Sequence, residues 1–80
     1  MSNKILTTRL NHELDELGVP SLITERVQAC SKLFKLPKFK MEALLNGVVA
    51  IDPNSIQKIA DELEVSKDWL LGNIQRKTKH

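Results

Sequence analysis

The chain has 80 residues, and its 12 Lys+Arg against 10 Asp+Glu leave a formal net charge of only +2. Hydrophobic residues make up 41% of the sequence and charged residues 28%, which excludes a disordered chain because the apolar side chains suffice for a core. A chain of this length buries only about 60–65% of its unfolded surface, which leaves little room for a deep enclosed active site.

The cysteine and histidine content argues against several further classes of protein. The single cysteine, Cys30, excludes a disulfide within the chain and, with no recognisable signal peptide, favours the reducing cytoplasm. No apolar stretch approaches the roughly 18–20 residues that span a bilayer, so no membrane partner is expected. No cluster has metal-ligand or Ser/His/Asp spacing, and we therefore expect no metal, no cofactor and no enzyme. Cys30 is expected in the core and His12 in solvent.

Two helices are predicted in the first half of the chain. The first carries a stripe of leucines and ends at Gly18, a good C-terminal cap. The stripe consists of Leu6, Leu10, Leu14 and Leu17. Val19-Pro20-Ser21 breaks this helix, and a second is predicted from about residue 22 or 24 to residue 34. Its apolar face consists of Ile23, Val27, Cys30 and Phe34, with Leu33 at the flank.

A third helix is predicted to start near Pro37, since the fixed φ of proline suits a first helical turn. It directs Met41, Leu44 and Leu45 inward and stops at Asn46-Gly47. Only about three residues, Lys35-Leu36-Pro37, separate the second and third helices. Two short helices with such a connection are typical of a helix-turn-helix, in which the second helix enters the DNA major groove.

Two more helices are predicted beyond a loop over residues 48–52. Asn54 and Gln57 resemble a capping box at the start of the fourth helix. Its apolar face consists of Ile56, Ile59, Ala60 and Leu63. Ser66 caps a fifth helix over residues 67–71, which Gly72 ends. The sequence thus predicts an all-α bundle of about five short helices over residues 1–72, followed by a basic, flexible tail over residues 73–80.

The small net charge conceals an uneven distribution. Residues 26–40 contain five Lys/Arg and no Asp/Glu, whereas residues 52–68 contain two Lys against five Asp/Glu. The positive segment coincides with the expected helix-turn-helix, and DNA affinity depends on the phosphates that such a cluster neutralises. The alternative interpretation is a solvated face rich in lysine.

A helical wheel places several side chains of the third helix away from the core. They are Phe39, Glu42, Ala43 and Asn46, with Lys38 and Lys40 on the flanks. In a major groove, Phe39 can contact thymine methyl groups, Glu42 can accept from cytosine N4, and either lysine can donate to guanine or phosphate. Alternatively, Phe39 folds back onto the edge of the core beside Leu36.

Three stretches of the chain together resemble the phage-repressor (lambda repressor/Cro-like, XRE) helix-turn-helix domains. They are Arg9-Leu10 with Leu17-Gly18-Val19, the segment RVQACSKLFKLPKFKMEALLNG at 26–47, and the segment at 56–72 that ends IADELEVSKDWLLG. The resemblance spans about residues 7–72. The chain departs from the family pattern at Cys30-Ser31, where Leu-Ala is usual, and at Lys35, where glycine is usual. Its segment between Gly18 and Arg26 is also longer than in the shortest family members.

The resemblance implies functional positions within the helix-turn-helix. Lys38, Phe39, Glu42 and Ala43 match positions that face the bases. Arg26, Gln28 and Asn46 match positions that contact phosphate. The local positive charge adds Lys35 and Lys40 as expected phosphate contacts.

The function expected from these observations is sequence-specific binding of double-stranded DNA by a transcriptional regulator. The resemblance implies a repressor of phage or mobile-element type that binds a palindromic operator as a homodimer. Trp69, Leu70 and Ile74 are the candidate dimer contacts, although Trp69 can instead pack helix five on the core. The alternatives are a protein-interaction module or an antitoxin-like partner on the same fold, because a fold does not fix a function.

Overall fold

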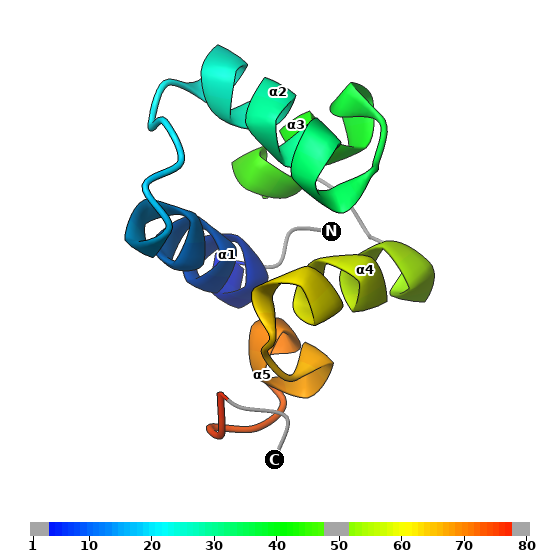
Figure 1. Ribbon diagram of the computed structural model, residues 1–80. Helices are drawn as coiled ribbons and strands as arrows, with labels where there is room; N and C mark the ends of the chain where they lie inside the picture. Colours follow the sequence, from blue (N-terminus) through cyan, green and yellow to red (C-terminus); the bar gives the residue numbers. More distant parts are fainter. Residues whose placement is uncertain (1–3, 48–51, 78–80) are drawn as a thin grey trace.

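A computed structural model describes residues 4–47 and 52–77 and shows five helices within them (Figure 1). These are α1 (Lys4–Glu16), α2 (Ile23–Phe34), α3 (Lys38–Asn46), α4 (Pro53–Leu63) and α5 (Lys67–Leu71). The α2–α3 pair lies at one end of the molecule and α5 at the other, with α1 and α4 between them (Figure 1). The predicted all-α bundle of about five short helices is confirmed. None of the helices described is long and apolar enough to cross a membrane.

All five helices contribute to one core. Its buried apolar residues are Leu6, Leu10, Leu14, Val27, Cys30, Phe34, Leu36, Met41, Leu44, Leu45, Ile56, Ile59, Ala60, Val65 and Leu70. The predicted inward faces are therefore confirmed except at their ends. Leu17 is 61% exposed, because α1 stops at Glu16 and the left-handed Gly18 turns the chain away. Ile23, in the first turn of α2, is 41% exposed.

The start of α4 differs from the predicted capping box. Asp52, and not Asn54, is the N-cap: its carboxylate accepts the backbone N–H of Ser55 at 2.9 Å and the Ser55 hydroxyl at 2.9 Å. Pro53 takes the first helical position, where its missing N–H costs nothing. Asn54 therefore lies one residue inside the helix. The cap predicted for α5 is confirmed, since Ser66 Oγ accepts the N–H of Trp69 at 3.4 Å.

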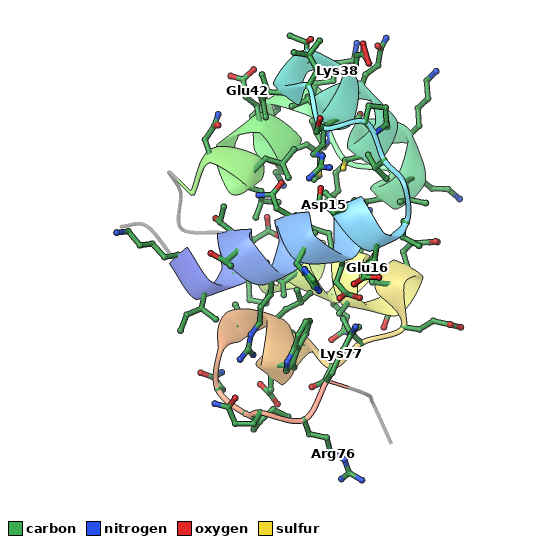
Figure 2. All side chains as sticks on the ribbon, turned by 90° about the vertical axis from the view of Figure 1, so that its left-hand side faces the viewer. Asp15, Glu16, Lys38, Glu42, Arg76 and Lys77 are labelled. Atoms are coloured by element: carbon green, nitrogen blue, oxygen red, sulfur yellow. The ribbon has the colours of Figure 1, made fainter. Side chains whose placement is uncertain are left out.

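Residues 73–77, which the sequence assigns to a basic tail, contact α1 and the N-cap residue of α5. The backbone N–H of Ser66 donates to the carbonyl of Lys77 at 2.8 Å, and Lys77 Nζ lies 2.8 Å from Glu13 Oε2. Arg9 Nη1 on α1 also donates to the carbonyl of Ile74 at 3.3 Å. The part of the tail that the structure describes thus lies at the α5 end of the molecule, away from α3 (Figure 2).

Candidate nucleic-acid interface

The connection between α2 and α3 is fixed by Ser31. Its backbone carbonyl accepts the N–H groups of Lys35 and Leu36, and its hydroxyl donates to the Leu36 carbonyl at 2.6 Å. Lys35 adopts the left-handed conformation, with φ 56° and ψ 46°, which residues other than glycine adopt at some cost. Lys35 therefore adopts the left-handed helix end that a glycine adopts more readily. Ser31, the neighbouring departure from the family pattern, supplies hydrogen bonds that stabilise it.

The inner face of α3 is held by apolar packing and by α1. Met41, Leu44 and Leu45 are buried, as predicted. Thr7 Oγ1 donates to the Leu44 carbonyl at 3.0 Å, and Asn11 Nδ2 reaches the Leu45 carbonyl at 3.5 Å. These bonds join the middle of α1 to the last turn of α3, so the rotation of α3 about its own axis is fixed from the inside.

The outer face of α3 carries the side chains that the helical wheel directs outward. Phe39 is 73% exposed; Lys38, Glu42 and Asn46 are also exposed, and Ala43 is half-buried. Lys38 and Glu42 lie at the same end of the molecule and point away from its body (Figure 2). The folded-back position of Phe39 beside Leu36 is not adopted. Within the described part of the chain, neither Lys38 nor Glu42 forms an ion pair.

The positive charges around α3 differ in whether they have an acidic partner. Lys32, Lys35 and Lys38 are exposed and form no ion pair with a described residue. Lys40 is half-buried, and its Nζ lies 3.1 Å from Asp52 Oδ2, the N-cap of α4. Lys32, Lys35 and Lys38 thus lie at the end of α2, in the turn and at the start of α3 without an ion-pair partner among the described residues, and Lys35 shares a surface hollow with Asp61 and Glu62 of α4. Lys40 can bind another anion only by leaving Asp52.

Arg26 does not reach the surface, in contrast to the expected phosphate contact. Only 4% of the residue is exposed. Its Nη2 donates to Asp15 Oδ1 at 2.5 Å and to the Val19 carbonyl at 3.0 Å, while Nε donates to the Pro20 carbonyl at 2.8 Å. Nη1 bonds both oxygens of Asn11. The guanidinium therefore has no donor left for a phosphate, whereas Gln28, two residues later on α2, is exposed.

A polar stripe on α1 connects this helix to the α2–α3 pair, and we did not predict it from the sequence. Thr7, Asn11 and Asp15 repeat at intervals of four residues, each directly after a leucine of the buried stripe. All three make the hydrogen bonds to α2 or α3 given above. The spacing of these residues could have predicted their role. Polar residues that repeat beside an apolar stripe lie at its border, where a neighbouring helix packs.

The candidate dimer contacts lie at the other end of the molecule. Leu70 is fully buried, so it belongs to the core and cannot contact a second copy. Trp69 is half-buried and packs against the core, with the Arg9 guanidinium 4.7 Å and the Lys77 ammonium 5.6 Å from its ring centroid. Ile74 is 40% exposed. The packing role of Trp69 is thus observed, and of the three only Ile74 is exposed.

Cys30 and His12 lie where the sequence predicts them, in the core and at the surface. Cys30 is fully buried, and the loss of hydration raises the pKa of its thiol to about 11, with Arg26 lowering it slightly. His12 Nε2 lies 3.3 Å from Glu16 Oε1 at the surface of α1. Over residues 4–47 and 52–77, no three His, Cys, Asp or Glu side chains come together in a way that could hold a metal ion.

Comparisons of the chain with protein-family models, with curated proteins and with solved structures gave no match.

Proposed function

We propose that this chain is a sequence-specific regulator of transcription that binds double-stranded DNA as a repressor. In this proposal α2 and α3 form a helix-turn-helix, and α3 lies in the major groove. The observation that carries the proposal is the outer face of α3, where Lys38, Phe39, Glu42 and Asn46 are exposed on a helix whose opposite face is buried. A base-reading helix needs such a face, with its backbone fixed from behind.

The three unpaired lysines support the same function. Lys32, Lys35 and Lys38 come from the end of α2, the turn and the start of α3. In a helix-turn-helix the first helix crosses the DNA backbone and the second begins in the groove. Each lysine that neutralises a phosphate releases counterions and strengthens binding at low salt. The total charge of +2 does not by itself weigh against DNA, because these three lysines form no ion pair with a described residue.

A palindromic operator bound by two copies belongs to the same proposal. Two-fold symmetric sites allow two copies of a small reading unit to add their contacts. With Leu70 in the core, a contact between copies has to use residues such as Ile74 or form only when both copies are on DNA.

The test is a selection from random duplexes at two salt concentrations, followed by titration of the enriched duplex. We expect one enriched motif with inverted symmetry and an affinity that falls as salt rises. The variant Lys32→Ala/Lys35→Ala/Lys38→Ala should lose most of this binding. The control Lys67→Ala/Arg76→Ala removes two positive charges at the α5 end of the molecule and should bind like the unaltered chain.

The second candidate function is a protein-interaction module, and one observation favours it. Leu17, Leu22 and Ile23, at the α1–α2 connection, are 61%, 59% and 41% exposed, which is unusual for large apolar side chains so close in the chain. The selection separates the two functions: an enriched motif supports the regulator, and binding equal for all duplexes or absent altogether favours the interaction module.

A further inference from the structure

We infer that Phe39 and Glu42 together determine the DNA-sequence specificity of α3. Phe39 contacts the C5-methyl group of a pyrimidine, and Glu42 accepts a hydrogen bond from the N4 amino group of a cytosine, which is either the same base or its neighbour. This inference rests on the proposed function and adds the base chemistry that the helix reads. Both side chains lie on the outer face of α3, three residues apart.

The position of Phe39 is the first argument. At 73% exposed it is the most exposed large apolar side chain described, and it lies outside the group of residues that pack against the core. Its neighbours on α3 are the charged Lys38 and Lys40. A phenyl ring in a groove contacts apolar groups, and the C5-methyl of a pyrimidine is the apolar group that the major groove displays.

The charge of Glu42 is the second argument. An exposed carboxylate on a face that approaches phosphates is repelled by them, so it strengthens binding only where it accepts a hydrogen bond. Two base groups donate in the major groove, adenine N6 and cytosine N4. Adenine also presents its N7 acceptor beside N6, which repels a carboxylate, whereas cytosine presents no acceptor in the groove. Glu42 therefore selects cytosine.

The spacing of the two residues links the two contacts. Side chains three residues apart on a helix have Cβ atoms about 5–6 Å apart, and neighbouring bases of one strand are about 3.4 Å apart. Phe39 and Glu42 therefore reach the same base or adjacent bases. A thymine next to a cytosine supplies the methyl and amino groups on two bases, and 5-methylcytosine supplies both groups on one.

The experiment uses the full chain and the duplex enriched by the selection, and it changes one methyl group at a time. Each thymine is replaced by deoxyuridine in one series, and each cytosine by 5-methylcytosine in another. We expect one position at which loss of the thymine methyl weakens binding, or gain of the cytosine methyl strengthens it, by about fourfold, the effect of one buried methyl group. Weaker binding on loss of a thymine methyl identifies thymine as the source of the methyl group. Stronger binding on gain of a cytosine methyl identifies 5-methylcytosine.

Two variants connect that effect to the residues. In Phe39→Ala the methyl group should no longer change the affinity, while Leu17→Ala, which removes another exposed apolar side chain, should keep the full effect. Glu42→Ala should bind duplexes that lack this cytosine more tightly, because the repulsion between the carboxylate and the phosphates is lost. Its preference for cytosine at one position should fall from about tenfold to near unity. The control Glu62→Ala removes an exposed carboxylate from α4 and should keep the preference.

The outcomes separate this inference from the proposed function. An enriched motif whose affinity ignores every methyl change, or a methyl effect that persists in Phe39→Ala, overturns the inference and leaves the regulator intact. A cytosine preference that survives in Glu42→Ala also overturns it. If no motif is enriched at all, the proposed function fails and the inference fails with it.

Discussion

Arg26 and Asp15 form an ion pair of 2.5 Å in which the side chain of the arginine is 5% exposed and that of the aspartate 63%. Asp15 lies in the last turn of α1, and Arg26 lies in the first turns of α2. The same guanidinium bonds the carbonyls of Val19 and Pro20 in the connection between these helices. One side chain thus fixes the α1–α2 connection and, through α2, the placement of the proposed reading helix.

Replacing Arg26 should therefore affect folding far more than a surface arginine does. We expect Arg26→Ala to lower the free energy of unfolding by about 3 kcal/mol, because the groups of Asn11, Asp15, Val19 and Pro20 all lose a hydrogen bond from the same guanidinium. Lys32→Ala, which removes an exposed cation from the same helix, should change it by less than about 0.5 kcal/mol. Urea unfolding followed by circular dichroism measures both. Equal stability of the two variants would contradict the internal role of Arg26.

The core assignment makes a second prediction. Ile59 is fully buried, so Ile59→Ala should cost about 2–5 kcal/mol through lost burial and the cavity left behind. Leu17→Ala removes a similar side chain at a position that is 61% exposed, and it should cost less than about 0.5 kcal/mol. Thermal melting of the two variants under the same conditions checks this difference, and similar melting temperatures would refute the assignment of Ile59 to the core.

The lysines around α3 should differ in how they respond to salt. If Lys38 contacts a phosphate, Lys38→Ala should reduce the slope of log affinity against log salt by about one unit. Lys40 is paired with Asp52, so Lys40→Ala should change the slope by less. Titrations of the enriched duplex at several salt concentrations, with Arg76→Ala as the control, measure these slopes. A larger change for Lys40→Ala than for Lys38→Ala would show that the pair with Asp52 opens on DNA.

Asp52 gives the fold a dependence on acid pH. The backbone N–H of Ser55, then Lys40 and the Ser55 hydroxyl, lower the pKa of Asp52 from 3.8 to about 2. Because the pKa is lower in the folded state, this group stabilises the fold above about pH 4, and the contribution is lost as the pH falls towards 2.

The variant Asp52→Asn tests this dependence, since an asparagine still caps the helix but carries no charge. We expect the unaltered chain to melt at a higher temperature than Asp52→Asn at pH 6, and the difference to shrink between pH 4 and pH 2. Melting curves recorded across this range provide the measurement. A difference that stays constant with pH would mean that the charge of Asp52 does not stabilise the fold.

The sequence by itself determined where the helices lie, because the signals for them are local. The apolar spacing of α1, α2 and α4, the glycines at 18, 47 and 72, and the Ser66 cap act within a few residues of the chain, and the structure follows them. The outer face of α3 was predictable for the same reason: once Met41, Leu44 and Leu45 are buried, helical geometry directs Phe39 and Glu42 outward.

Only the tertiary structure decided which charged and apolar groups remain at the surface. From the sequence, Arg26 is predicted to contact phosphate, as are other cations of residues 26–40. Leu70 is predicted, with Trp69 and Ile74, to contact a second copy of the chain. Arg26 is buried because the last turn of α1 brings Asp15 and Asn11 to it, and Leu70 is buried because α5 packs on the core. For these two side chains burial depends on residues of other helices, and the pattern within their own helix does not specify it.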